Sequence, residues 1–513
     1  MKNLSFLILI LLFACKDQKP KDSYLGIVNI DISGNEKAIP HFEKGLLLLH
    51  SFEYEDSRES FLKAQEEDPK LLMAYWGEAM TYNHSLWTEQ DYDQGIRALE
   101  KLKEHQNNTD VSELEKDLIS AITVLYRSDT VKVQRDENYA KKMASLYNKY
   151  PDNHEVAAFY ALSLLGSVED GRDEVIYGQG AKIAQGILDK NPKHPGALHY
   201  VIHSYDDPGH AELALAAADS YAIVAPDAGH ALHMPSHIYM ALGMWDQVVS
   251  SNENSFQASI NRMNAKNLAP HGRGYHAFHW LEYGYLQQGR FEEAEKMVFD
   301  MEGFMTAAPN QYSKTHMVYL KGTYLVESND WNSDVSAIEV DIEDLNVVTR
   351  SKYRFINGMK AYQKNDKEGL VAAINAIKKD HDKESYLVSY DDAPFCSGAS
   401  RYNTSPSMLV RTEIMMYQLM AMNGWLENNP KETESFLKKS IELEENLSFS
   451  FGPPVVQKPT TELYADWLLA HGRTEEAAKQ YKKTLDKTPK RSKSEKGLQI
   501  CENKLSELAM TVN

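Results

Sequence analysis

A period of 34 residues constrains the fold of this chain more than any other feature of its sequence. Pro192 and Pro226 each close a pair of amphipathic segments, and they lie 34 residues apart. The stretch 286–294 (LQQGRFEEA) recurs at 469–477 (LAHGRTEEA), with glycine and the acidic pair at the same places. The segments are about 12 to 18 residues long, and alternating β-branched runs are nearly absent. Because a repeated helical unit grows by addition, 513 residues need not form several separate cores.

The repeated unit resembles the tetratricopeptide repeat (TPR), which has a glycine at the turn after its first helix, a small residue early in its second, and a closing proline. The resemblance covers most of residues 38–489. It implies an all-α fold, a right-handed superhelix (α-solenoid) of TPR-like helix pairs whose concave face is lined mainly by the first helices. We predict an N-terminal array over 38–300, degenerate repeats over 301–410 with a long loop near 381–407, and further repeats with a capping helix over 411–513.

The N-terminus has the pattern of a bacterial lipoprotein signal. Lys2 precedes an apolar run over 4–13, which is too short for a membrane-spanning helix of roughly 20 residues. The run ends in LFAC, which resembles a lipobox. This resemblance implies a signal peptide over 1–14, lipid on Cys15, and a flexible tether over 15–37. We therefore expect membrane anchoring through Cys15 in the bacterial cell envelope, at the outer membrane and either periplasmic or surface-exposed; an ordinary secretory signal is the alternative.

Composition excludes several classes of protein. Hydrophobic residues make up 42% of the chain, which is enough to bury a core and excludes a disordered protein. The 55 Lys and Arg against 74 Asp and Glu give a net charge of −19. Binding to nucleic acid needs clustered basic side chains, so we expect no nucleic-acid partner. Three cysteines are too few for a disulfide framework in a chain of this length.

Two histidine pairs stand at equivalent positions of successive repeats. His199 and His203 are four residues apart, and His233 and His237 repeat that spacing 34 residues later. Residues four apart share one face of a helix, and equivalent positions of stacked repeats are neighbours, so we expect four imidazoles to face one volume. Such pairs are typical ligands of divalent transition metals, here Zn, Fe, Mn or Cu. The alternative is a neutral, hydrogen-bonded layer of histidines, or an anion site when they are protonated.

Two further alignments extend the candidate site. Aligning Gly243 with Gly289 places His279 in the column of His233 and makes it the fifth predicted metal ligand. Pro235 lies between His233 and His237, so we expect a helix to start or kink there. The other predicted pocket residues come from the same alignment, from an alignment of Gly289 with Gly472, from the C-terminal motif and from the ends of the first helices, where a superhelix can curl over its groove: His230, His276, Tyr283, His50, Asn83, His84, Lys458, Glu462 and Asp466.

Four motifs resemble a group of bacterial TPR lipoproteins and secreted proteins with HxxxH and HMPSHIY motifs. They are AYWGEAMTYNHSLW at 74–87, LHYVIH at 198–203, GHALHMPSHIY at 229–239, and the Gly452-Pro453-Pro454 segment that leads to Lys458 and Glu462. This resemblance implies a fold and the place of a site, but it implies no reaction.

The sequence leaves three functions open. The first is a His-rich metal pocket in the groove that binds or processes a small molecule or peptide, with Glu462 or Asp466 as a base for metal-bound water. The second is a scaffold for another envelope protein, in which the histidines are structural. The third is a nutrient-binding lipoprotein similar to SusD, beside an outer-membrane transporter. Whether the protein is an enzyme stays open.

Overall fold

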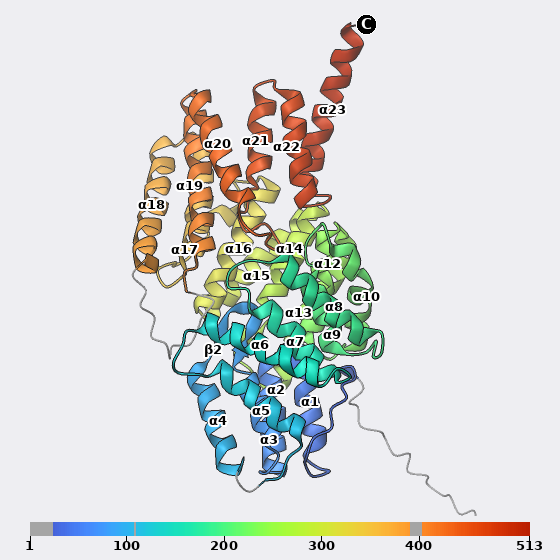
Figure 1. Ribbon diagram of the computed structural model, residues 1–513. Helices are drawn as coiled ribbons and strands as arrows, with labels where there is room; N and C mark the ends of the chain where they lie inside the picture. The colour runs from blue at the N-terminus through green and yellow to red at the C-terminus, as the bar shows by residue number, and fades with distance from the viewer. Residues whose placement is uncertain (1–23, 107–108, 390–402, 513) are drawn as a thin grey trace, which may run out of the picture.

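The computed structural model describes residues 24–106, 109–389 and 403–512, and it is built almost entirely of helices (Figure 1). The first helices are α1 Ile39–His50, α2 Tyr54–Glu67, α3 Leu72–Met80, α4 Tyr92–Gln106, α5 Glu113–Leu125, α6 Lys132–Lys149, α7 His154–Gly166, α8 Glu174–Leu188, α9 Pro195–Ser204, α10 Leu215–Val224, α11 Gly229–His233 and α12 Pro235–Ala241. They are followed by α13 Trp245–Lys266, α14 Tyr275–Gln287, α15 Phe291–Ala307, α16 Gln311–Ser328, α17 Val347–Gln363, α18 Lys367–Ser389, α19 Pro406–Leu426, α20 Pro430–Glu445, α21 Thr460–Ala470, α22 Thr474–Lys487 and α23 Ser492–Val512.

Short elements connect some of these helices. The 3₁₀ turns are η2 Ser85–Trp87, η3 Ala211–Ala214, η4 Pro270–Gly272 and η5 Asp334–Ala337. The strands β1 Asn83–His84 and β2 Glu89–Gln90 pair antiparallel around η2. Within the described ranges, no helix is long and apolar enough to cross a membrane.

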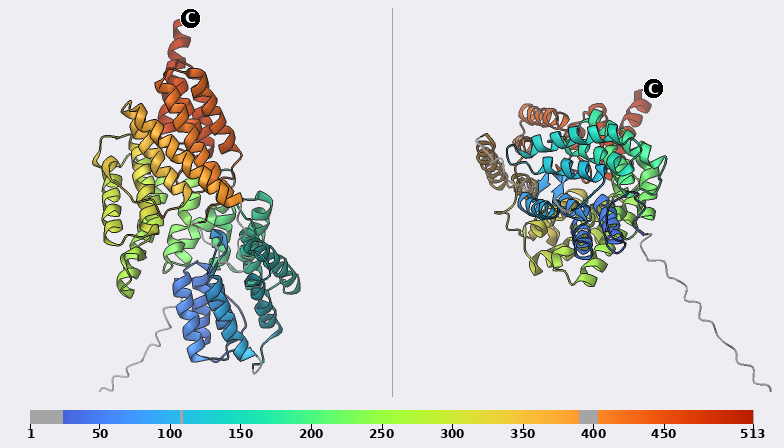
Figure 2. Two further views of the ribbon diagram at one scale, coloured as in Figure 1. Left: turned by 90° about the vertical axis from the view of Figure 1, so that its left-hand side faces the viewer. Right: turned by 60° about the horizontal axis from the view of Figure 1, so that its bottom comes forward.

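Consecutive helices pack against each other as pairs, as in α1 with α2, α7 with α8, and α21 with α22. The array runs from α1–α5 at one end of the molecule to α19–α23 at the other, and the end of α23 extends beyond its neighbours (Figures 1 and 2). The predicted all-α superhelix of helix pairs is confirmed.

The recurring glycine explains why the sequence repeats there. Gly243, Gly289 and Gly472 end the first helix of their pairs with φ of +64°, +75° and +73°. Only glycine adopts this left-handed backbone without steric cost, so each turn can lead directly into the second helix.

The core divides near α13 and α14. One cluster of buried apolar side chains extends from Leu25 to Val248 and includes Trp280 and Tyr283, and the other extends from Val249 to Cys501. The described segment 329–346 between α16 and α17 interrupts the helices, whereas α18 continues to Ser389, inside the loop predicted near 381–407.

The N-terminal segment differs from the predicted tether. The backbone N–H of Ile27 donates to the carbonyl oxygen of Lys193 at 2.9 Å. The backbone N–H of Asp227 donates to the carbonyl oxygen of Tyr24 at 3.3 Å. These backbone bonds hold the beginning of the described chain against the array, so a tether over 15–37 would have to end before residue 24. The predicted signal peptide and Cys15 lie outside the described residues.

Candidate metal centre

Pro235 places the histidines of its repeat on two short helices. A proline has no N–H for a helical hydrogen bond, so α11 ends at His233 and α12 begins at Pro235 itself. The rings of His233 and His237 still lie 4.9 Å apart, because the residue between the two helices keeps helical φ and ψ angles. The first pair, His199 and His203, lies on α9 with ring centroids 4.8 Å apart.

The structure divides six histidines into two groups of three. The first triad is His199, His203 and His230, and the second triad is His233, His237 and His276. In each triad, one ligand atom from each residue lies within 4.8 Å of the other two. The triads are neighbours, since the rings of His203 and His237 lie 5.7 Å apart and those of His230 and His233 lie 5.9 Å apart.

The first triad holds three buried nitrogen atoms that accept no hydrogen bond. Among the described residues, Nε2 of His199, of His203 and of His230 has no hydrogen-bond partner, and we call these the three open nitrogens. Nδ1 of His199 donates to the main-chain oxygen of His50 at 2.8 Å, which leaves the lone pair on Nε2. Burial, together with the neighbouring imidazoles, holds the pKa of all three rings well below the usual 6.5, so they are neutral at pH 7.

Phe52 closes the first triad. Its ring centroid lies 4.2 Å from that of His199, 6.0 Å from that of His203 and 5.8 Å from that of His230. Phe52 has a φ of +55°, a strained conformation for a bulky side chain, in the turn between α1 and α2. The turn therefore keeps an aromatic ring over the three histidines. The ring centroid of Trp87 lies 6.1 Å from that of His230, with the two rings nearly perpendicular.

The second triad is held by side chains outside it. Nδ1 of His237 lies 2.5 Å from Oδ2 of Asp206, and Nδ1 of His233 lies 2.7 Å from Oδ1 of Asn252. The Nε2 atoms of His233 and His237 face each other at 3.1 Å. The ring of His276 lies 4.7 Å from that of His233.

A third group, His50, Glu155 and His194, has the same proximity but different bonding. The carboxylate of Glu155 accepts from Nε2 of His50 at 2.7 Å and from Nε2 of His194 at 3.2 Å. The hydroxyl of Tyr200 lies 2.9 Å from Nδ1 of His50, and the N–H of Ala197 donates to Nδ1 of His194 at 3.1 Å. Every ring nitrogen has a partner, so His50 belongs to a structural network.

His279 does not lie with either triad. Its Nε2 is 3.0 Å from the hydroxyl of Thr323, and its ring is 5.5 Å from that of Tyr319. His276, one turn earlier on α14, has the neighbours that the alignment assigned to His279. The same offset of one turn occurs in the first triad, where His230 and not His233 lies beside His199, so the alignment of glycines does not give the side-chain neighbours of successive repeats.

Lys458, Glu462 and Asp466 form an ion cluster of their own, in which Lys458 and Glu462 are buried. Nζ of Lys458 lies 2.8 Å from Glu462 and 2.6 Å from Asp466, and the guanidinium of Arg491 binds Glu462 at 2.7 Å. Arg491 also donates to the hydroxyl of Tyr283 at 2.9 Å. Burial by itself would raise the pKa of Glu462. The positive charges of Arg491 and Lys458 outweigh this effect and hold that pKa well below its usual range. These ion pairs and hydrogen bonds connect the residues of the cluster to one another. The carboxylates are therefore engaged in a structural network and do not serve as a base for either triad.

Asn83 and His84 lie at the margin of the site. The side chain of Gln90 donates to Oδ1 of Asn83 at 2.9 Å, inside the small β1–β2 hairpin. The ring of His84 stacks on that of Tyr54 at 3.9 Å, and its Nδ1 lies 3.1 Å from Glu89. Both residues shape the aromatic wall beside Phe52 and contribute no atom to a triad.

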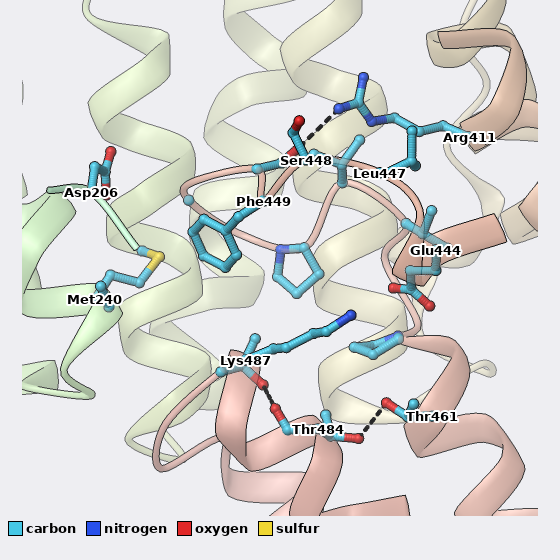
Figure 3. Close-up of a pocket in the computed structure, with 18 of the residues that line it drawn as sticks. Asp206, Met240, Arg411, Glu444, Leu447, Ser448, Phe449, Thr461, Thr484 and Lys487 are labelled. Carbon is cyan, nitrogen blue, oxygen red and sulfur yellow. Dashed lines mark hydrogen bonds between the residues drawn. The ribbon is translucent and has the colours of Figure 1, made fainter. Parts of the chain in front are cut away.

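Two cavities adjoin the histidines. One, of about 270 Å³, is lined by His237. Asp206 and Met240 lie on one side of this cavity and Arg411 and Glu444 on the other (Figure 3). The other, of about 600 Å³, is lined by His230, His233 and His276 together with Glu53 and Arg262.

The loop 446–459, between α20 and α21, packs against the histidines. The ring of Phe451 lies 5.1 Å from that of His237. Gly452 has a φ of +90°, and a Cβ there would lie 2.6 Å from Trp280. A glycine is therefore required for this close approach. The segments 74–87, 198–203, 229–239 and 452–462, singled out from sequence, thus surround one region of the molecule.

Sequence reasoning missed Phe52, Asp206 and Asn252 and gave His276 and His230 only a pocket role. Asp206 follows His203 by three residues, a spacing that places both near one helix end. Phe52 and Asn252 carry no signal of their own, because their contacts depend on how distant repeats pack.

No protein-family model and no curated protein sequence matches the chain. Solved structures similar to it include the Cut9–Hcn1 hetero-tetramer of APC/C, with 12% identity over 93% of this chain and 78% of that chain and a TM-score of 0.38. Yeast Tom70 has 11% identity over 92% and 89%, with a TM-score of 0.34. The human IFIT1 dimer with m7Gppp-AAAA has 11% identity over 93% and 89%, with a TM-score of 0.39. Likeness at this level assigns no function to the chain.

Proposed function

We propose that this chain is a lipid-anchored helical-repeat protein of the bacterial envelope that holds a divalent transition-metal ion in the first triad and binds or processes a small molecule or peptide beside it. The observation that supports the metal most strongly is the set of three open nitrogens. A buried nitrogen without a partner costs about 1–3 kcal/mol, and three in one small volume are therefore a feature that needs a ligand.

The donor set fits a metal ion of the zinc type. Neutral imidazole nitrogen is a preferred ligand of Zn, Cu, Fe and Ni, with Zn–N bonds of about 2.0–2.1 Å. The hydrogen bond from Nδ1 of His199 to the oxygen of His50 fixes the tautomer that a ligand needs. When bound, an ion with three protein ligands and an open position acts as a Lewis acid and lowers the pKa of coordinated water. The residues around it exclude solvent, with Phe52 as the cover.

Metal content tests this proposal directly. We expect tag-free protein to bind zinc, measured by elemental analysis after dialysis, and the His199→Ala/His203→Ala double variant to lose one ion per chain. His279→Ala is the matched control, because His279 is a partly buried histidine of α14 that bonds to Thr323. Metal-free protein after loading with zinc, iron, manganese and copper would contradict the proposal.

The lipid anchor rests on the sequence pattern at Cys15. We expect the wild-type chain in the membrane fraction and the Cys15→Ser variant in the soluble fraction, with mass spectrometry showing acyl chains on the N-terminal peptide of the former. A wild-type chain cleaved at another residue and lacking lipid would leave the metal proposal untouched and replace the anchor by ordinary secretion.

A protein-interaction scaffold is the second candidate, and the helix-pair array supports it. The final helix α23 extends beyond its neighbours and exposes Ile500 and Met510. If the double histidine variant remains folded and the wild type binds no metal, the histidines are structural and the scaffold becomes the better proposal.

A further inference from the structure

The second triad has a bonding pattern that differs from that of the first, and it carries a separate inference. We infer that His233, His237 and His276 form a second site for a divalent transition-metal ion with nitrogen preference, such as Zn²⁺, with Asp206 as its positioning residue. This site deepens the proposed function, but it uses different atoms and stands or falls independently of the first triad.

The tautomers of His233 and His237 follow from their partners. The amide nitrogen of Asn252 donates to the carbonyl oxygen of Val248 at 2.7 Å, so the amide oxygen faces His233 and accepts from its Nδ1–H. The carboxylate of Asp206 is likewise an acceptor for Nδ1–H of His237. Both protons of the neutral rings therefore lie on Nδ1, and both lone pairs lie on Nε2.

The two lone pairs point at each other across 3.1 Å. Two acceptors at this distance repel unless a cation lies between them, and that cation is either a proton on His237 or a metal ion. Two nitrogen ligands of one tetrahedral zinc ion lie about 3.3 Å apart, given Zn–N bonds of about 2.0–2.1 Å. A shared proton would use only these two nitrogens, whereas His276 supplies a third within the same 4.8 Å limit. The third ligand favours the metal ion.

The partners outside the triad match those that orient metal ligands. Asp206 is 1% exposed and Asn252 is fully buried, so both hold their histidines in one rotamer. A carboxylate that accepts from the far nitrogen of a metal-binding histidine raises the basicity of the ligand and places one negative charge near the cation. The site then has three neutral nitrogens and one compensating carboxylate.

The site is accessible from solvent on one side. His276 is exposed, and together with His233 it lines the cavity of about 600 Å³. His237 lines the cavity of about 270 Å³. Three protein ligands and an open side are the arrangement of metal sites that keep a position for water or a bound molecule.

The number of ions per chain tests the inference. Tag-free full-length protein is loaded with Zn²⁺, dialysed and measured by elemental analysis. We expect two ions in the wild type, one in His276→Ala, and one in His199→Ala/His203→Ala. His279→Ala, three residues further along α14, is the matched control and keeps two. Because His276 is exposed, its replacement leaves the core intact, and circular dichroism verifies folding.

The pattern of ion loss distinguishes the two sites. Two ions in His276→Ala would exclude His276 as a ligand. One ion in the wild type that persists in His276→Ala and disappears in His199→Ala/His203→Ala would leave the first triad as the metal site and show that a shared proton joins His233 to His237. One ion lost in His276→Ala alone would support the second site and contradict the first. If the wild type holds one ion and each of the two variants loses it, the two triads share a single site.

Discussion

The first triad and the group formed by His50, Glu155 and His194 are adjacent, equally compact and bonded in opposite ways. Both place three ligand atoms within 4.8 Å, and His199 donates to the main-chain oxygen of His50, so they share a border. Around Glu155 every ring nitrogen has a partner. In the first triad, three nitrogens have none within the described chain.

Closeness of histidines is therefore a poor criterion for a metal site. A carboxylate between two imidazoles satisfies the buried N–H groups and forms a stable joint without an ion. In the first triad no described group bonds to the three Nε2 atoms, so their hydrogen-bonding capacity is open to a ligand. The unsatisfied atoms, and not the distances, distinguish the two groups.

Removing the carboxylate should have the largest effect. We expect Glu155→Ala to lower the free energy of unfolding by about 2–6 kcal/mol, because it strands the buried N–H groups of His50 and His194 at about 1–3 kcal/mol each. Urea unfolding of the metal-free protein measures this loss. A loss below about 1 kcal/mol would mean that the group is not the structural joint described.

Zinc should stabilise the first triad and leave the Glu155 group unaffected. In the His276→Ala background, we expect zinc at a hundred times its Kd to add about 2.7 kcal/mol to the free energy of unfolding. The His203→Ala change should abolish that gain, which thermal unfolding with and without zinc measures. A gain of the same size in the presence of His203→Ala would contradict metal binding by this triad.

The positioning role of Asp206 predicts a smaller effect. Asp206→Asn keeps the shape and an acceptor for His237 but removes the charge, so one of the two zinc ions should bind about 10–100-fold more weakly. Competition with a chromophoric chelator measures the affinity, and the Co²⁺ spectrum reports the ligand field, which a merely structural role would not change. Asp207→Asn, whose partners are Arg172 and His210, is the control.

Acid should separate the two groups by the pH range in which each loses stability. The pKa of His203 in the folded protein is well below 6.5, chiefly because of burial, so below that pH the unfolded chain binds a proton that the folded chain does not. As the pH is lowered, the free energy of unfolding of the metal-free protein then falls by up to about 1.4 kcal/mol per pH unit for each such histidine. His203→Ala should flatten the curve by that amount between pH 6 and 5.

Glu155 changes stability in the same direction as His203, but at lower pH. Although burial raises its pKa, His194 and His50 hold it well below its usual range, so its contribution is complete above the unfolded pKa of about 4.3 and is lost as the pH falls further. Urea unfolding between pH 5 and 3 should therefore show the loss of the Glu155 contribution in the wild type and not in Glu155→Ala. An equal slope in both would contradict the charged state assigned to this carboxylate.

The fold followed from the sequence because it depends on local signals. Proline ends helices and glycine allows the left-handed turn, and Gly243, Gly289 and Gly472 behave as their recurrence predicts. The pairing of His203 with His237 followed from the same period, since both lie on helices that stack one repeat apart.

The bonding of the candidate site could not be predicted in this way. Side chains of successive repeats meet with an offset of one turn in both triads, so His276 and not His279 lies beside His233. Glu462 lies in an ion cluster with Lys458 and Arg491, and the alignment could not reveal those partners because they come from other repeats. Which nitrogens are left open depends on every hydrogen bond nearby, and no spacing encodes that.

Anomalous X-ray diffraction at the zinc edge, from crystals of zinc-loaded protein, tests the central claim most directly. The account predicts a peak about 2.0–2.1 Å from Nε2 of His199, His203 and His230, and none between His50, Glu155 and His194. A peak in the Glu155 group, or none at the three open nitrogens, would contradict it.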